Sequence, residues 1–167
     1  PDPLGWSAAR HGVSSMPMEP WRDVGGAAKP FATYETDIRA LLDASRAAIE
    51  PDATRRAAQI EALAPRTWPL APACAGTARA GVLLIHGLSD TPFSLGDLGA
   101  ALAAQPEACL RVRSILLPGH GSVPGDLTRA TAAQWKAAVR YGVSSFAGEV
   151  DQVHLVGFSL GGALALD

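Results

Sequence analysis

Hydrophobic residues in the second half of the chain form short continuous runs, each followed by a segment with helical spacing. The runs extend from Gly81 to His86, from Val112 to Leu117 and from Val153 to Val156. Continuous apolar runs of this length are typical of strands that are buried on both faces of a parallel sheet. Strand–helix order repeated three times from residue 81 predicts an α/β fold, a mostly parallel sheet with helices on both faces.

The helical segments after these runs carry start signals and one-sided apolar stripes. Thr91 is the expected N-cap of the helix that follows the first apolar run, and Pro92 would occupy that helix's N-terminal position. Its predicted core stripe is Leu95, Leu98 and Leu102. Thr131 is expected to cap the helix that follows the second apolar run. The apolar stripe of this helix comprises Trp135, Ala138, Val139, Gly142, Val143 and Phe146. The third is predicted over residues 160–166.

The first 65 residues have a different pattern. Residues 1–35 are rich in Gly, Pro and Ser but hold four aromatic residues, which favours an irregular arm that wraps a folded body over a disordered tail. Helices are predicted over residues 36–49 and 53–63. We therefore divide the chain into an arm and helical extension (1–65) and a sheet-bearing domain (66–167), whose first segment, 66–73, is an edge strand or a loop.

Composition excludes several classes of function. The 167 residues are 48% hydrophobic and 18% charged, with a net charge of −2, so no basic surface for nucleic acid is expected. The aliphatic run Val82–Ile85 is far shorter than the roughly 20 residues that span a bilayer, and we expect no transmembrane segment. We also expect no metal or other cofactor.

The candidate chemistry centres on Ser159, in the motif Gly157-Phe158-Ser159-Leu160-Gly161. The motif stands directly between a predicted buried strand and a predicted helix, which is the context of a nucleophile elbow. A sharp turn there exposes the serine hydroxyl, and Gly157 and Gly161 relieve the crowding that the turn creates. The alternative is a glycine-rich helix start with Ser159 as an ordinary N-cap.

Two further turns follow the earlier strands at the same edge of the sheet. In sites with a nucleophile elbow, one oxyanion-binding N–H belongs to the residue after the nucleophile and another to the loop after an earlier strand. These groups would be the backbone N–H of Leu160 and of Leu88. His86, beside Leu88, and His120, in the second turn, are interpreted as structural rather than catalytic residues.

Together these motifs resemble the α/β-hydrolase superfamily, in particular its bacterial carboxylesterases, monoacylglycerol lipases and lysophospholipase-like enzymes. The similar segments are His86–Ser94, Leu117–Gly121, Pro124–Leu127 and Gly157–Gly162. The resemblance covers about half of the chain, from residue 81 onward. It implies that residues 66–167 are the N-terminal half of a hydrolase catalytic domain, with the C-terminal part of the α/β-hydrolase fold missing from this chain.

The chain departs from this family after the elbow. The family orders its catalytic triad as serine, acid and histidine, but only eight residues follow Ser159 and none is a histidine. His11, His86, His120 and His154 all precede it, and His154 is expected to be buried in the last strand. We expect the catalytic Asp and His beyond residue 167, in a downstream segment or a second chain that completes the fold. A fragment, a cleaved enzyme and a partial chain all remain open.

The expected fold makes a prediction about the two cysteines, Cys74 and Cys109. An antiparallel strand before residue 81 would lie beside the strand 112–117, which would place both cysteines at one end of the sheet, within reach of a disulfide. Two separate buried thiols are the alternative. A disulfide would favour a periplasmic or secreted protein, and the localisation is otherwise unknown.

The function predicted from the sequence is the hydrolysis of small-molecule carboxylic acyl esters by Ser159, with no activity expected from this chain alone. Thioesterase, amidase and peptidase chemistry on the same site remain alternatives, as does a truncated chain without catalysis.

Overall fold

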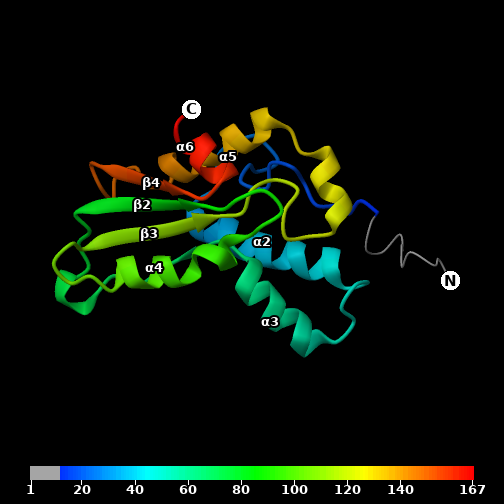
Figure 1. Cartoon of the computed structure of the whole chain (residues 1–167), viewed down its shortest axis with the longest axis horizontal. Helices are drawn as coiled ribbons and strands as arrows, with labels where there is room; N and C mark the ends of the chain where they lie inside the picture. Colours follow the sequence, from blue (N-terminus) through cyan, green and yellow to red (C-terminus); the bar gives the residue numbers. More distant parts are fainter. Residues whose placement is uncertain (1–11) are drawn as a thin grey trace.

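A computed structural model describes residues 12–167. Four strands form one sheet in the order β1-β3-β2-β4, three of which are seen side by side in Figure 1. The strands are β1 (Arg66–Thr67), β2 (Ala80–Ile85), β3 (Leu110–Ile115) and β4 (Val153–Gly157). β2 pairs in parallel with β3 and β4, whereas β1 is antiparallel to β3. The α/β class and the three predicted parallel strands are thus confirmed, with β3 beginning two residues earlier than expected.

The central strand β2 explains why the sheet is buried on both faces. All six of its residues are buried, as its continuous apolar run predicted. Because side chains alternate along a strand, Leu83 and Ile85 enter one hydrophobic core, while Val82 and Leu84 enter a second core on the opposite face.

Helices cover these two cores in separate layers. The helices are α2 (Phe31–Arg46), α3 (Ala53–Leu63), α4 (Gly96–Ala103), α5 (Ala132–Ser144) and α6 (Leu160–Ala165). α2, α5 and α6 contribute to the larger core, and α4 contributes to the smaller one, so α4 lies on the opposite face of the sheet from α5 and α6 (Figure 1). Among residues 12–167, no helix combines the length and the apolar character needed to cross a bilayer.

Helix α2 begins five residues earlier than predicted. The arm was expected to remain irregular to residue 35, but the helix starts at Phe31, directly after Pro30. Phe31 and Tyr34 lie on the same buried side as Ile38 and Leu42, so their burial in the larger core extends the helix toward its N-terminus. The arm before α2 is also anchored, because Trp21 is buried in that core.

The helix predicted from Thr91 is wrong in two respects. A 3-10 helix occupies Pro92–Leu95 before α4 begins, and Thr91 makes no side-chain capping bond among the described residues. Leu98, predicted in the core, is 41% exposed. The buried position is Gly99, where an added Cβ would lie 2.5 Å from Cζ2 of Trp68, so the indole occupies the place expected for leucine.

The last strand, β4, is less buried than predicted. Its residues are half-buried except His154, which is exposed, so the expectation of a buried His154 is wrong. The reason is its position, because β4 pairs only with β2 among residues 12–167 and lies at the edge of the sheet.

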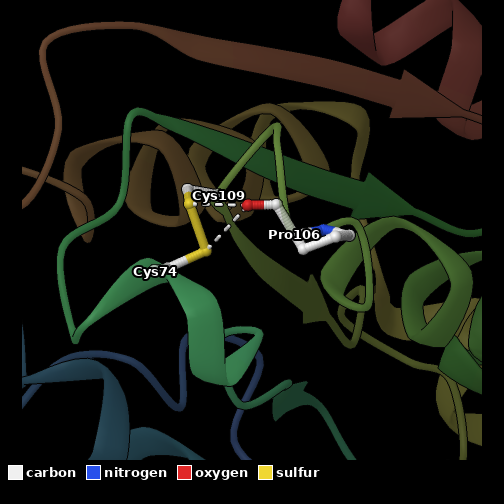
Figure 2. Close-up of a disulfide and its surroundings, with 3 residues drawn as sticks. All are labelled: Cys74, Pro106 and Cys109. Atoms are coloured by element: carbon white, nitrogen blue, oxygen red, sulfur yellow. Dashed lines mark hydrogen bonds between the residues drawn. A yellow bond between two sulfur atoms is a disulfide. The ribbon is translucent and has the colours of Figure 1, made fainter.

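A disulfide bond joins Cys74 to Cys109, with a Cα–Cα distance of 5.5 Å (Figure 2). Cys74 ends a 3-10 helix (Pro72–Cys74) rather than a strand, because β1 spans only two residues of the predicted segment 66–73. Cys109 stands directly before β3, at the amino end of the parallel strands. The carbonyl oxygen of Pro106 contacts both sulfurs, 3.7 Å from Cys74 Sγ and 3.3 Å from Cys109 Sγ.

Candidate active site

The turn between β4 and α6 is a sharp elbow. β4 ends at Gly157 and α6 begins at Leu160, so only Phe158 and Ser159 connect them. Ser159 has φ 52° and ψ −113°, a backbone conformation that costs a residue with a side chain about 1–3 kcal/mol. The Gly161 N–H donates to the Phe158 carbonyl at 2.8 Å and closes the turn. Ser159 is exposed as a result.

The elbow admits no side chain at its two predicted glycines. A Cβ at Gly157 would lie 2.2 Å from the carbonyl carbon of Gly161. A Cβ at Gly161 would lie 2.0 Å from the carbonyl oxygen of Ile85, in the neighbouring strand. At Gly162, by contrast, the nearest atom would be 3.3 Å away. The first two glycines are therefore required by close backbone contacts, and the contact at Gly162 is much less severe.

The loop after β2 lies directly against the elbow. The Phe158 N–H donates to the Ile85 carbonyl at 3.0 Å, which joins the two turns. A Cβ at Gly87 would lie 3.5 Å from Ser159 Cβ, so the loop backbone passes beside the nucleophile candidate. Within residues 12–167, the N–H groups of Leu88 and Leu160 donate to no backbone acceptor.

His86 is a fully buried residue that connects two loops. Its Nε2 accepts a hydrogen bond from the Leu117 N–H at 3.0 Å, which assigns the proton to Nδ1, 2.9 Å from the Gly87 carbonyl oxygen. Burial lowers the pKa of His86 to about 4. Both ring nitrogens of this neutral imidazole are hydrogen-bonded, so His86 fixes the loop in position. It has no free lone pair with which to accept a proton from a nucleophile.

His120 is the second buried histidine at this end of the sheet. Its ring lies edge-on to His86, with centroids 4.9 Å apart, and its Nδ1 lies 3.0 Å from the Pro118 carbonyl oxygen. The same oxygen accepts a bond from the Trp135 indole N–H at 3.0 Å. Burial lowers the pKa of His120, so this imidazole is also neutral at pH 7.

A buried carboxylate, Asp126, was not assigned a role from the sequence. It is fully buried and accepts bonds from the Ser14 N–H at 2.7 Å, the Ser14 hydroxyl at 2.5 Å and the Ser122 hydroxyl. Although burial opposes ionisation, these bonds and Arg129 hold the pKa of Asp126 below its usual value. Asp126 thus ties the arm to the 118–129 loop; its only sequence signal was its place in the Pro124–Leu127 segment.

The remaining histidines do not supply a base in the described part of the chain. His154 is exposed on the edge strand, and His11 lies outside the described residues. Asp167 forms an ion pair with Lys136 at 2.5 Å on the surface. Residues 12–167 hold no group of three or more His, Cys, Asp or Glu side chains suited to a metal ion.

Comparison with known proteins identifies the family of this chain. The model of the alpha/beta hydrolase family matches residues 82–167, slightly more than half of the chain. The chain belongs to the alpha/beta hydrolase family. The matched hydrolase segment begins in β2 and includes both the loop at His86–Leu88 and the elbow at Ser159.

Two relatives place this alpha/beta hydrolase chain in a lipase- or esterase-like branch. It is 37% identical over 87 residues to the thermostable monoacylglycerol lipase of Bacillus sp. (strain H-257), covering 52% of this chain and 33% of the lipase. A solved structure from a study of LipS and LipT, two metagenome-derived lipolytic enzymes, superposes with a TM-score of 0.52 and 28% identity. That match covers 61% of this chain and 38% of the other. The chain therefore spans about a third of the length of these lipolytic relatives.

Proposed function

We propose that the protein hydrolyses carboxylic acyl esters, with Ser159 as the nucleophile. The observation that carries this proposal is the exposed Ser159, held at φ 52° between two glycines that admit no Cβ. A serine strained in this way at the carboxyl end of a parallel sheet lowers the stability of the fold, and such strained residues cluster at active sites, which supports a functional role for the hydroxyl. The lipolytic relatives support an ester as the substrate.

In the proposed reaction, Ser159 Oγ attacks the ester carbonyl carbon while a histidine takes the hydroxyl proton. The N–H groups of Leu88 and Leu160, which have no backbone acceptor in residues 12–167, hold the negative oxygen of the tetrahedral intermediate. Each such donor contributes about 3 kcal/mol to lowering the barrier. The intermediate expels the alcohol, which receives the proton, and water then hydrolyses the acyl-serine by the same steps.

The histidine and its acidic partner are proposed to lie beyond residue 167, in a downstream segment or a second chain. The two histidines at the site, His86 and His120, are buried and neutral, and both use their Nδ1 for loop carbonyls. The apolar side chains of Leu88 and Phe158 are 54% and 60% exposed beside the elbow, which suits contact with an acyl group.

Labelling with a fluorophosphonate tests the nucleophile. A protein that continues past residue 167 should be labelled, and the Ser159→Ala variant should lose labelling and ester hydrolysis by about four orders of magnitude or more. Ser15→Ala, which alters an exposed serine in the arm, is the matched control and should leave both unchanged. Labelling that persists in Ser159→Ala would exclude this serine as the nucleophile. A panel of matched ester, thioester and amide substrates then separates the three acyl-transfer chemistries.

A further inference from the structure

The peptide unit between Gly87 and Leu88 carries one anchored group and one free group. The Gly87 carbonyl oxygen lies 2.9 Å from His86 Nδ1, whereas the Leu88 N–H donates to no backbone acceptor within residues 12–167. No peptide bond in the described part of the chain is cis. In a trans peptide the C=O and the N–H point in opposite directions, so whatever fixes the Gly87 carbonyl also fixes the direction of the Leu88 N–H.

The tautomer of His86 makes its Nδ1 a donor to that carbonyl. Its Nε2 accepts from the Leu117 N–H at 3.0 Å, so the proton of the neutral ring is on Nδ1. The ring is fully buried, and the ring of His120 packs edge-on against it with centroids 4.9 Å apart. Rotation of the imidazole would break both hydrogen bonds in a buried place, where an unpaired polar group is costly. A rigid donor therefore holds the Gly87 carbonyl.

The residues around this peptide do little to fix its orientation. Gly87 has no side chain, and glycine allows its backbone a wider range of dihedral angles than other residues do. The Leu88 side chain is 54% exposed, so packing does not hold it, and Ser89 follows in the left-handed region with φ 58°. This peptide nevertheless lies beside the proposed nucleophile, because a Cβ at Gly87 would be 3.5 Å from Ser159 Cβ.

We propose that His86 is a positioning residue for the hydrolysis. Through the Gly87 carbonyl it keeps the Leu88 N–H directed away from the buried ring, as a donor to the oxyanion. The Leu117 N–H, in the turn after β3, maintains the tautomer that this requires. The inference rests on the proposed function, because the oxyanion is the partner that it assigns to the Leu88 N–H.

Two substitutions separate the roles of the two nitrogens of His86. Asparagine places an amide N–H near the position of Nδ1, and glutamine can place an amide oxygen near that of Nε2. In a protein that continues past residue 167, His86→Gln should lower kcat for ester hydrolysis about tenfold to a hundredfold with little change in KM, because the Leu88 N–H is no longer aimed. His86→Asn should retain kcat within about threefold. His154→Asn, at the exposed histidine of β4, is the matched control and should leave kcat and KM unchanged.

A double-mutant cycle tests whether His86 acts through the Leu88 N–H. Replacement of Leu88 by its α-hydroxy acid turns the amide into an ester and removes the N–H, which should lower kcat about a hundredfold or more. In that background His86→Gln should cause almost no further loss, since the group that His86 positions is absent. A purely structural role would give independent losses that multiply.

A measurement on the protein with native His86 avoids the risk that a variant misfolds. Phosphonylation of Ser159 would place a negative oxygen at the Leu88 N–H, which polarises the peptide and strengthens the Gly87 carbonyl as an acceptor. The ¹H resonance of His86 Nδ1–H should therefore move downfield when the fluorophosphonate reacts.

The outcomes distinguish this inference from the proposed function. If Ser159 is labelled, the role of His86 would be overturned by equal kcat values for folded His86→Asn and His86→Gln, by losses that multiply in the cycle, or by an unchanged Nδ1–H resonance. No labelling of Ser159 in the native protein would overturn the proposed function, and this inference with it.

Discussion

The two ends of the parallel strands are built differently. At the amino end, Cys74 and Cys109 are buried and bonded to each other, and the Arg79 N–H donates to the Cys109 carbonyl at 2.9 Å. At the carboxyl end, Ser159 is exposed and the N–H groups of Leu88 and Leu160 have no backbone acceptor among residues 12–167.

Backbone strain alone does not distinguish these ends. Ala75 and Cys109 have positive φ at the amino end, as Ser89 and Ser159 have at the carboxyl end. The difference lies in what the strain accomplishes. A strained residue whose polar groups are all hydrogen-bonded holds two segments of the chain together. A strained residue whose polar groups are exposed and not hydrogen-bonded presents those groups to a ligand. Variants at the amino end should therefore affect stability alone, and variants at the carboxyl end should affect chemistry as well.

The largest effect is expected for Gly161→Ala at the carboxyl end. Its Cβ would lie 2.0 Å from the Ile85 carbonyl oxygen, so strand β2 and the elbow must separate. We expect a loss of about 3 kcal/mol or more in the free energy of unfolding, and loss of fluorophosphonate labelling. Gly162→Ala, whose Cβ would lie 3.3 Å from the Gly157 carbonyl oxygen, should lower the free energy of unfolding and the labelling rate much less. Denaturant unfolding and labelling rates measure the two quantities, and similar behaviour of the two variants would contradict the elbow geometry.

Removal of the disulfide should have the next largest effect, confined to stability. The bond closes a loop between residues 35 positions apart, for which loop-closure entropy predicts a contribution of about 3–4 kcal/mol. The double variant Cys74→Ala, Cys109→Ala should lower the free energy of unfolding by this amount. The labelling rate of the folded protein should stay unchanged. A slower rate in fully folded protein would show that the two ends of the sheet are coupled.

His86 offers a smaller and pH-dependent test at the carboxyl end. Its pKa is about 4 in the folded protein and 6.5 when unperturbed, so protonation favours the unfolded state. Its contribution to stability is complete above pH 6.5 and is lost as the pH falls toward 4, with a slope of up to about 1.4 kcal/mol per pH unit.

His86→Asn should reduce that slope, which unfolding experiments across this pH range would measure. It should also cost about 1–3 kcal/mol at pH 7, because the Leu117 N–H loses its acceptor. His120, whose pKa is also lowered by burial, should leave part of the slope in place. An unchanged pH profile in His86→Asn would mean that this histidine does not titrate across unfolding.

Local sequence signals predicted the elements whose structure is determined locally. The buried run of β2 was evident from residue type, and the capping box of Thr131 with Gln134 marks the start of α5 as expected. The position of Ser159 followed from the order of strand, glycine, serine and helix. In these cases the interactions that define the element involve residues close together in the chain.

Contacts between distant residues account for the errors. Leu98 is exposed because Trp68 packs on Gly99, a contact that no helical stripe encodes. His154 is exposed because β4 lies at the edge of the sheet, which depends on strand order rather than on the composition of β4. The bond from Arg46 to the Gly121 carbonyl oxygen was missed for the same reason, since the two residues are 75 positions apart in the chain.

The bonds between Ser14 and Asp126 have a consequence for how the chain folds. They join residues 112 positions apart, so their formation must overcome the entropy of closing a very long loop. Contacts of this range are slow to form compared with helix α2 or the turn at 118–121. We therefore expect the arm to dock after the sheet has assembled, and its release to expose the buried Asp126 carboxylate without breaking the strand pairs.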